Sequence, residues 1–265
     1  MKPVIKYQGG KTKELSTIKE MLPPHISRVV EPFCGGAAVS FALGYPALLS
    51  DINREVINLY SVIADVDKFP LLLHKVNELK CADHDILQKE YYEARDVINS
   101  PFSSFNNLER AIAYVIVRQL CFSGMERYNA KGEFNVPFGH YQRFSCNLSP
   151  EHHKFIHSKV NLKWGDFAYF FDNLQEGDFV FIDPPYLERL GYTTGDGGDE
   201  LHTKLYAKLS TITVPWMIIH SDHDFYREYY KDFNIREKGF NYSQRFGKDK
   251  DHTNAKVKHL YITNY

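Results

Sequence analysis

The sequence predicts an α/β protein: a parallel sheet with helices on both faces, interrupted by a mainly helical insert. Strand–turn–helix patterns fill residues 1–65 and return in residues 156–265, and such alternation implies a parallel sheet. Residues 66–155 carry long amphipathic helical patterns instead. We therefore expect one domain formed by 1–65 and 156–265, with 66–155 as an insert.

Apolar runs that stop at glycines or polar residues predict the strands, and the periodic segments between them predict the helices. The expected strands are Arg28–Phe33, Ala47–Ser50, Asp178–Ile182, Trp216–Ile219 and Val257–Thr263, and the expected helices are Ala37–Leu43, Glu55–Val62, Leu71–Leu87 and Lys89–Ile98. Ala111–Val117 fits either a buried helix or a strand. The turn pattern Asn129–Gly132 precedes the alternating Glu133–Val136, which predicts a hairpin.

The chain has 265 residues with 32 Lys plus Arg against 33 Asp plus Glu, so its formal net charge is -1. Hydrophobic residues make up 43% and charged residues 25%, which excludes a disordered or fibrous chain. Taken alone, this balance argues against a dedicated nucleic-acid binder, which usually carries a basic excess. Two local groups of basic residues are candidates for a basic face: Arg110, Arg118, Arg127, Lys131 and Arg143, and separately Arg245, Lys248, Lys250, Lys256 and Lys258.

The sequence lacks the patterns of a secreted, membrane-spanning or metal-binding protein. We find no signal peptide and no window with the ~18 apolar residues of a spanning helix. The four cysteines show no paired or zinc-like spacing, which favours a reduced cytoplasmic protein without a metal. His152, His153 and His157 have no neighbouring carboxylate or thiolate pattern, and Asp222–Asp224 is typical of a helix start.

The strongest chemical pattern is Asp183–Tyr186, which reads Asp-Pro-Pro-Tyr and follows a predicted strand. Ligands of open α/β sheets bind beyond the carboxyl ends of strands, so chemistry is expected there. The two prolines stiffen the loop and remove backbone donors, which leaves a carboxylate and carbonyls as acceptors for an aromatic amino group. Tyr186 would stack on the base, a contact worth ~1–3 kcal/mol. The alternative is a proline-stiffened strand exit without a chemical role.

A second pattern, Glu31–Gly36, lies between a predicted strand and helix, and Asp51 ends the next strand. Glycines there allow a tight turn and a close ligand, and the spacing suits a carboxylate that binds ribose hydroxyls of an adenosine-type cofactor. Gly10-Lys11-Thr12 imitates the end of a phosphate-binding P-loop, but Ile5 stands where that loop needs glycine. From the residues alone, this N-terminal segment is a flexible turn with solvated lysines.

Five motifs, taken in order, resemble the Dam-type DNA adenine-N6 methyltransferases. They are Lys6–Lys11, Glu31–Gly36, Asp51–Asn53, Arg127–Tyr141 and Asp183–Tyr186, and they cover most of the chain. The resemblance implies a Rossmann-like methyltransferase sheet and an inserted, mainly helical DNA-recognition domain with a β-hairpin. It also implies site-specific transfer of a methyl group from S-adenosylmethionine to N6 of adenine in double-stranded DNA.

By motif position, the resemblance implies that cofactor and target base lie at the strand ends. Its cofactor-binding positions are Tyr7, Lys11, Glu31, Phe33, Gly35, Asp51, Ile52, Asp166 and Asp183. The turn Phe33–Gly36 would lie along the methionine moiety of the cofactor, and Asp51 would bind its ribose. Asp183 and Pro184 would hold the amino group of a flipped adenine, while Tyr186 stacks on it. The product would be S-adenosylhomocysteine, with no metal required.

The same resemblance implies DNA contacts at Lys6, Ser123, Met125, Arg127, Asn129, Pro137, His140 and Tyr141. Arg127 would read a guanine, as Arg commonly does in the major groove. Lys6 would contact the other side of the site, and Met125 would wedge into the space that the adenine leaves. GATC is therefore the leading site. Ser123 and His140 depart from the Asn and Arg of the bacterial pattern.

Several alternatives stay open at this point. Enzymes of the same fold methylate N4 of cytosine or adenine in RNA, and Asp183 favours adenine because the N4-cytosine enzymes more often have Ser there. A non-catalytic DNA-binding or NTP-driven protein is less compatible with Asp183–Tyr186 and with the incomplete P-loop. We expect a monomer without an obligatory protein partner. A restriction–modification, chromosomal or bacteriophage role is undecided, and Gly191–Gly198 is a candidate mobile loop.

Overall fold

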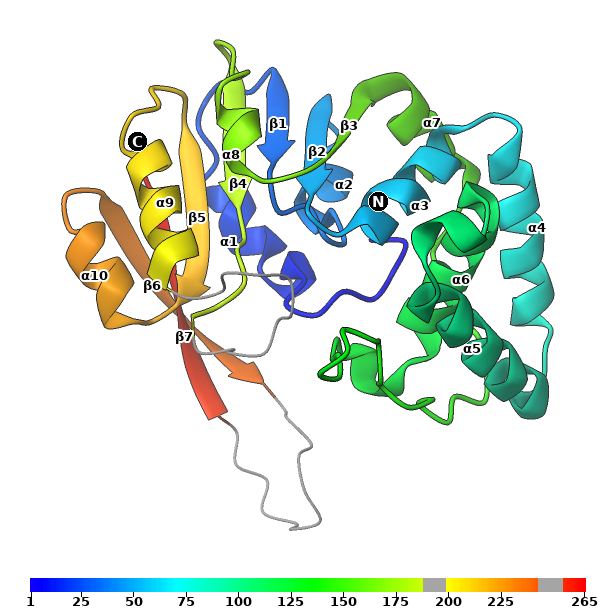
Figure 1. Cartoon of the computed structure of the whole chain (residues 1–265). Helices are drawn as coiled ribbons and strands as arrows, with labels where there is room; N and C mark the ends of the chain where they lie inside the picture. The colour runs from blue at the N-terminus through cyan, green and yellow to red at the C-terminus, as the bar shows by residue number, and fades with distance from the viewer. Residues whose placement is uncertain (188–198, 243–254) are drawn as a thin grey trace.

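The computed structural model describes residues 1–187, 199–242 and 255–265. In these residues seven strands form one sheet in the order β3-β2-β1-β4-β5-β7-β6 (Figure 1). The strands are β1 (Arg28–Glu31), β2 (Ala47–Asp51), β3 (Val160–Trp164), β4 (Asp178–Ile182), β5 (Trp216–Ser221), β6 (Asn234–Tyr242) and β7 (Ala255–Thr263). β1 to β5 are parallel, and β7 runs antiparallel between β5 and β6. The predicted parallel sheet is confirmed, with an antiparallel edge in addition.

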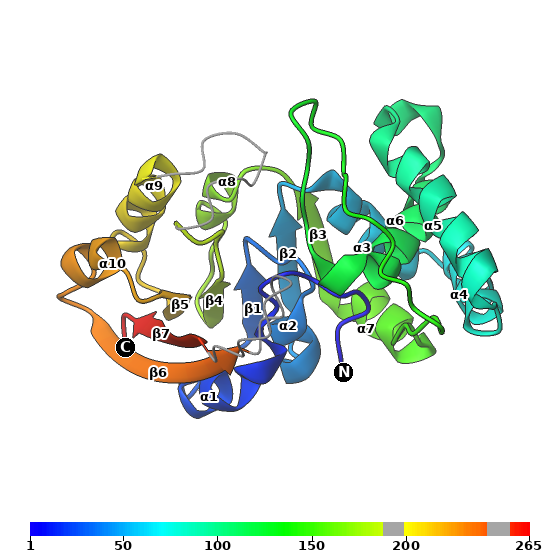
Figure 2. The same cartoon turned by 90° about the horizontal axis from the view of Figure 1, so that it is seen from below.

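Helices cover both faces of the sheet, as predicted (Figure 2). They are α1 (Leu15–Glu20), α2 (Ala38–Leu43), α3 (Arg54–Ala64), α4 (Lys68–Lys80), α5 (His84–Asn99), α6 (Asn107–Leu120), α7 (Pro150–Lys159), α8 (Ala168–Phe171), α9 (Asp199–Leu209) and α10 (Asp224–Tyr229), with 3-10 turns η1 (Lys11–Lys13), η2 (Phe102–Ser104) and η3 (Phe122–Gly124). Alternate residues of a strand serve opposite faces. In β4, Phe179 packs in a cluster with Ile18 of α1, and Val180 packs in a cluster with Leu205 of α9. Both faces are therefore apolar, which explains the continuous apolar runs in the sequence.

The helices α4, α5 and α6 form a group beside the sheet, next to α3 (Figure 1). The apolar pattern predicted one helix over Leu71–Leu87, and this is wrong, because α4 ends at Lys80 and α5 begins at His84. Asp83 accounts for the break: its side chain accepts a hydrogen bond from the backbone N–H of Ile86 and so caps α5.

The ambiguous apolar run Ala111–Val117 lies within α6 and is helical. Asn106 and Glu109 begin this helix with a capping box, in which each side chain accepts a hydrogen bond from the other residue's backbone N–H. The division of the chain at residues 65/66 and 155/156 stays a prediction, and Phe155 lies inside α7.

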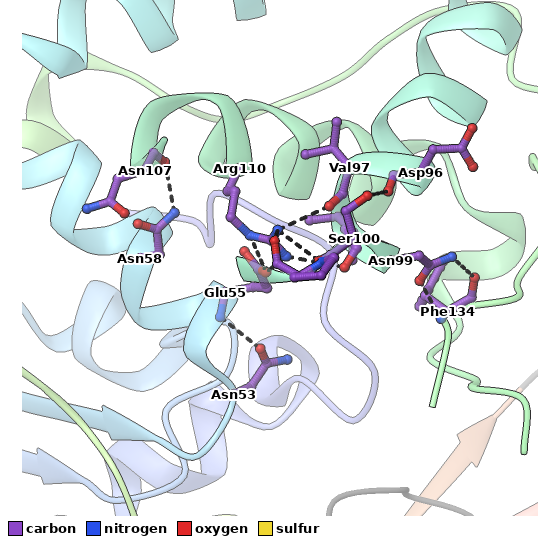
Figure 3. Close-up of polar contacts among 12 residues, drawn as sticks. Asn53, Glu55, Asn58, Asp96, Val97, Asn99, Ser100, Asn107, Arg110 and Phe134 are labelled. Carbon is purple, nitrogen blue, oxygen red and sulfur yellow. Dashed lines mark hydrogen bonds and ion pairs between the residues drawn. The ribbon is translucent and has the colours of Figure 1, made fainter. Parts of the chain in front are cut away.

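Arg110 of α6 is buried and has a structural role in the helical group. Its guanidinium pairs with Glu55 of α3, with 2.8 Å between Nε and Oε1. It also donates to backbone carbonyls at the end of α5 and just after it, those of Val97, Ile98, Ser100 and Pro101. Figure 3 shows Arg110 and Glu55 pointing toward one another from neighbouring helices. Replacing one member of a buried pair is strongly destabilising, so Arg110 ties α3, α5 and α6 together.

The candidate basic face of residues 108–144 is reduced by this burial. Arg110 is 2% exposed and Arg118 is 1% exposed, so neither can contact DNA. The other three basic residues are exposed, against two exposed acidic residues, Glu109 and Glu133, because the side chain of Glu126 is only 7% exposed. The local excess of positive charge therefore falls from two (five against three) in the sequence to one (three against two) at the surface. Arg245, Lys248 and Lys250 of the second group lie outside the described residues.

The predicted hairpin of the insert is a tight turn with single bridges rather than a pair of assigned strands. Tyr128 and Phe134 form an isolated antiparallel bridge, and Asn135 N donates to Arg127 O over 3.1 Å. Asn99 of α5 holds the turn from outside, because its side chain bonds both backbone polar groups of Phe134 (Figure 3). The hairpin pattern thus predicted the reversal of the chain but not the length of pairing.

The remaining predictions divide in the same way. The stretch with His152, His153 and His157 is the helix α7, and Asp224 begins α10, as expected. The edge strand β6 and the helices α1 and α9 were not predicted, and Gly191–Gly198 lies outside the described residues. Among the helices described, none is long and apolar enough to cross a membrane.

Candidate active site

Three carboxylates stand at one edge of the sheet, where parallel strands end. Glu31 is the last residue of β1, Asp51 is the last of β2, and Asp183 directly follows β4. β1 lies between β2 and β4, so the chain runs outward from β1 in opposite directions on its two sides. Such a point, at the carboxyl ends of the strands, is where open α/β sheets bind ligands.

Asp51 holds the turn between β1 and α2. Its Oδ2 accepts a hydrogen bond from Gly35 N over 2.8 Å, and its Oδ1 accepts one from Asn53 N over 2.9 Å. The side chain is buried, and this burial raises the pKa of Asp51 to about 6 although both backbone donors oppose the rise. A buried carboxylate at the end of a strand suits a ligand that carries hydroxyl donors or positive charge.

Glu31 is a second buried carboxylate at this edge. Its Oε1 accepts a hydrogen bond from Ser40 N in α2 over 2.7 Å. Burial raises the pKa of Glu31 to about 7, and the nearby Asp183 adds to the rise. The site therefore concentrates negative charge that water solvates poorly, which a bound cation would stabilise.

Gly35 lets the turn approach its neighbours closely. Its φ is 42°, in the left-handed region, and an added Cβ would lie 2.5 Å from Cε1 of Tyr7. Tyr60 donates its hydroxyl to Gly35 O over 2.8 Å. The turn is thus fixed by Asp51, Tyr60 and the ring of Tyr7, and no larger residue fits at Gly35.

Lys11 is buried against Asp183 rather than solvated. Its side chain is 3% exposed, with Nζ 2.5 Å from Asp183 Oδ1 and 2.8 Å from Gly9 O. The interpretation of this segment as a flexible turn with solvated lysines is therefore wrong for Lys11, whereas Lys6 and Lys13 are exposed. Burial raises the pKa of Asp183, and the Lys11 ammonium opposes that rise. Behind the pair lies Glu14, which accepts a hydrogen bond from Tyr261 over 2.6 Å.

His220 supports the far end of the Asp183–Tyr186 loop, and the sequence analysis missed it. Its Nε2 accepts a hydrogen bond from Leu187 N over 3.1 Å, while its Nδ1 lies 2.9 Å from Ser221 O. Its ring lies 4.6 Å from that of Tyr186 and stacks at 4.1 Å on that of Tyr226. Burial lowers the pKa of His220 to about 3, so the imidazole is neutral. A polar residue ending the apolar strand β5 was the pattern that could have found it.

The other predicted cofactor positions lie around the ends of β2 and β3. Ile52 is 53% exposed, and its carbonyl accepts a hydrogen bond from Trp164 Nε1 over 3.0 Å. Asp166 is half-buried, with 3.4 Å between its Oδ2 and Lys204 Nζ. Phe33 packs on Phe167, with ring centroids 5.1 Å apart.

The predicted DNA-contacting residues are brought together by two distant parts of the chain. Ser123, Arg127, Pro137 and His140 are exposed, Met125, Asn129 and Tyr141 are half-buried, and Lys6 comes from the N-terminal segment. Lys6 Nζ lies 4.0 Å above the Tyr141 ring and donates to Gln119 O. Arg127 donates to the side chain and the carbonyl of Asn135 over 2.7 and 2.9 Å. Asn129 has a local role as well, because its Oδ1 accepts two backbone hydrogen bonds within the turn.

Comparison with known proteins decides the family. A profile described as D12 class N6 adenine-specific DNA methyltransferase matches residues 7–244. The chain belongs to this family. The predicted resemblance to the Dam-type enzymes is thereby confirmed.

Relatives of this D12-class chain include viral, archaeal and bacterial proteins. The Type II methyltransferase M.CviBI of Paramecium bursaria Chlorella virus NC1A is 32% identical over 276 residues, which span the whole of both chains. The DNA N-6-adenine-methyltransferase of Escherichia phage P1 is 32% identical over 88% of this chain and 31% of its own length. The DNA adenine methylase of Haemophilus influenzae is 28% identical over 86% of this chain and 82% of its own.

Membership of the D12 class implies S-adenosylmethionine as cofactor and DNA as substrate, and the residues present fit that cofactor. Asp51 and Glu31 supply buried carboxylates at the ends of β2 and β1, which suit a ligand that carries hydroxyl donors and positive charge. In the ranges that the structure describes, no group of three or more His, Cys, Asp or Glu side chains could hold a metal ion.

Proposed function

We propose that this D12-class enzyme transfers the methyl group of S-adenosylmethionine to N6 of an adenine flipped out of duplex DNA, with GATC as the first site to test. The observation that carries the proposal is the position of Asp183–Tyr186, directly after β4 and beside the buried carboxylates of β1 and β2. We also propose that the enzyme acts as a monomer in the cytoplasm. Sedimentation of the free and DNA-bound enzyme tests the monomeric state.

Some residues at the strand ends would bind the cofactor, and others would bind the target base. Asp51 would accept hydrogen bonds from the ribose, and the Phe33–Gly36 turn would line the methionine moiety, with Tyr7, Lys11, Ile52 and Asp166 at the edges of the pocket. When bound, S-adenosylmethionine supplies a methyl group made electrophilic by its positive sulfonium. Glu31 and Asp183 would stabilise that positive charge in a site with little water.

Asp183 would act on the target base as well as on the cofactor. Its carboxylate and the Pro184 carbonyl would accept the two N6–H hydrogen bonds, which favours a nitrogen whose lone pair is free to attack. Tyr186, braced by His220, would stack on the flipped ring. Asp183 is also placed to take the proton that N6 releases once the new bond has formed. Most of the acceleration would come from holding the two reactants in line.

The exposed residues of the 121–141 segment would read the duplex. Arg127 would donate to a guanine in the major groove, and the Asn135 side chain that now binds it would hold the guanidinium in place beforehand. Lys6 would contact the opposite part of the site across Tyr141, and Met125 would fill the gap left by the adenine. Ser123, Asn129, Pro137 and His140 would line the same surface.

Identifying the modified nucleoside tests the reaction directly. Duplex DNA is incubated with the enzyme and methyl-labelled S-adenosylmethionine and digested to nucleosides, and we expect label in N6-methyl-2′-deoxyadenosine alone. Label in N4-methylcytosine, or transfer only to RNA, would replace this proposal by one of the alternatives. Sequencing methylated DNA from cells that express the chain then identifies the recognition sequence. The genes next to the one that encodes this chain show whether a restriction enzyme accompanies it.

A further inference from the structure

Arg118, near the end of α6, donates hydrogen bonds to backbone carbonyls of two segments that lie far apart in the sequence. Its Nε donates to Lys6 O over 3.1 Å, its Nη2 to Gly124 O over 3.1 Å and its Nη1 to Met125 O over 3.3 Å. The side chain is 1% exposed. A guanidinium has five donors in a rigid plane, so it can hold several carbonyls at once in a defined geometry.

The two segments are joined a second time beside Arg118. Gln8 Oε1 accepts a hydrogen bond from Glu126 N over 2.8 Å, although 118 positions separate the residues. The Glu126 carboxylate also lies 3.6 Å from Arg118 Nη1. The N-terminal segment that carries Tyr7 and the 124–126 turn that precedes Arg127 are therefore fixed to each other by buried and half-buried polar contacts.

Arg118 also touches the cofactor side of the molecule through Tyr7. The guanidinium carbon lies 5.3 Å from the centroid of the Tyr7 ring. That ring packs on Gly35, and Gly35 N donates to Asp51. A continuous packed path therefore runs from Asp51 through Gly35 and Tyr7 to Arg118, and then to Met125.

The turn that Arg118 holds has a backbone that depends on outside support. Ser123 and Gly124 both lie in the left-handed region, with φ of 54° and 65°. Left-handed backbone is unfavourable for a serine, so the turn needs its carbonyls held from outside to keep this shape. Met125 directly follows Gly124, and Arg127 lies two residues further on. The direction of both side chains therefore depends on Arg118.

We propose that Arg118 is a positioning residue that couples binding of the cofactor to recognition of the DNA site. The inference rests on the proposed function. A ligand that orders Asp51, Gly35 and Tyr7 orders Arg118 as well, and so aligns the 124–126 turn. DNA that orders the turn does the same in reverse, because coupling between two binding sites is reciprocal.

Calorimetric titration measures this coupling without any methyl transfer. S-adenosylhomocysteine is titrated into the enzyme alone and into the enzyme with a duplex carrying its methylation site, and the ratio of the two dissociation constants is the coupling factor. For the wild type we expect a factor of about 5 to 150. Arg118→Lys keeps the charge but loses the planar guanidinium, whose three nitrogens each reach a different carbonyl, and should bring the factor close to one. Gln8→Ala, at a half-buried position, should lower it in part.

Arg110 supplies a matched control. Like Arg118, it is a buried arginine of α6 that pairs with a glutamate and donates hydrogen bonds to backbone carbonyls. It lies eight residues earlier, about 12 Å along the helix, and away from Tyr7 and the 124–126 turn. Arg110→Lys should lower the melting temperature while leaving the coupling factor at its wild-type value. Circular dichroism melts of all variants show which of them are folded at the titration temperature.

Each outcome decides the matter. Coupling lost in Arg118→Lys, reduced in Gln8→Ala and kept in Arg110→Lys supports the inference. A wild-type factor of one, an unchanged factor in Arg118→Lys, or equal losses in the two arginine variants overturns it. If Arg118→Lys does not fold, the Gln8→Ala titration decides alone. Failure of the wild type to form N6-methyladenine, which the nucleoside analysis reports separately, overturns the proposed function instead.

Discussion

The carboxyl edge of the sheet and the 121–141 segment are built in contrasting ways. At the edge, Asp51 and Glu31 are buried, accept hydrogen bonds from backbone N–H groups, and have raised pKa values. In the segment, Arg127, Pro137 and His140 are exposed on a backbone held by two isolated bridges and by hydrogen bonds from α5 and α6. The first arrangement buries its polar groups away from water, and the second presents exposed side chains from a backbone that its neighbours hold in place.

In the proposed function, this difference separates the groups that act in methyl transfer from those that read the DNA. Groups that act on a cation or a reacting nitrogen need fixed positions and little water, which the ends of strands provide. Groups that read base edges need exposure and tolerate substitution around them, which a supported loop provides. Site preference could then change within the segment without disturbing Asp183 or Asp51.

Asp183→Asn is the most severe test of this separation. The amide presents N–H donors to the target amino group and removes a negative charge, so methyl transfer should fall by about 10²–10³-fold or more. DNA discrimination should be unchanged, because that depends on the other region. Single-turnover transfer and competitive DNA binding measure the two effects.

Asp178→Asn is the matched control for that variant. Asp178 lies at the opposite end of the same strand, is 2% exposed and pairs with Arg28 over 2.6 Å. We expect it to lower the melting temperature and to leave the single-turnover rate near that of the wild type. A loss of transfer as large as that of Asp183→Asn would mean that β4 as a whole is damaged.

Arg127→Ala tests the other region. It should lower discrimination at one guanine position by ~1–3 kcal/mol while the transfer rate on saturating cognate DNA changes little. Competition between duplexes that differ at single base pairs measures the discrimination. Lys131→Ala, at the exposed tip of the same turn, should weaken all duplexes equally and reduce the salt dependence. Uniform weakening by Arg127→Ala would instead assign it to phosphate.

The sequence was informative about the strand ends and less so about what surrounds them. Asp51 and Asp183 could be placed at one edge because parallel strands end together, whatever the rest of the fold. The partner of Lys11 could not be predicted, since it is joined to Asp183 only by the folding of distant segments.

Buried arginines were the clearest failure of the sequence patterns. Arg118 and Arg110 count as positive charge in a local sum, and only the packing of α6 against other elements shows that their donors are used by carbonyls. His220 is similar, because its two nitrogens are occupied by backbone groups of a loop and of its own strand end. Local composition therefore overstated the exposed basic charge of the insert.

Glu31→Gln tests the electrostatic character of the carboxyl edge through stability. The pKa of Glu31 is raised to about 7, so the folded protein holds a proton that the unfolded chain releases near pH 4.5. Its contribution to stability is full below that pH and is lost as the pH rises through about 7. Without ligand, the variant should therefore gain on the wild type by about 1–3 kcal/mol between pH 4.5 and 7.5, measured by denaturant unfolding.

Glu14→Gln should show the opposite sign. Burial alone would raise the pKa of Glu14. The hydrogen bond with His259 and the positive charge of the nearby Lys11 outweigh this effect and lower the pKa. Its contribution is present above the unfolded pKa and is lost as the pH falls, so this variant should approach the wild type only in acid. A parallel pH dependence for the two variants would contradict the raised pKa of Glu31.

The smallest expected effect concerns the cofactor's own charge. S-adenosylmethionine and S-adenosylhomocysteine differ by the methyl group and the positive charge of the sulfonium, so the ratio of their affinities isolates that charge. Asp51, with a pKa of about 6, and Glu31, with one of about 7, lose their protons between pH 5.5 and 8, and each carboxylate formed attracts the cation. The affinity ratio should therefore rise with pH, by about tenfold for each pKa unit by which the bound cation lowers these groups. Glu31→Gln should flatten the rise, and a ratio independent of pH would mean that the sulfonium lies away from both carboxylates.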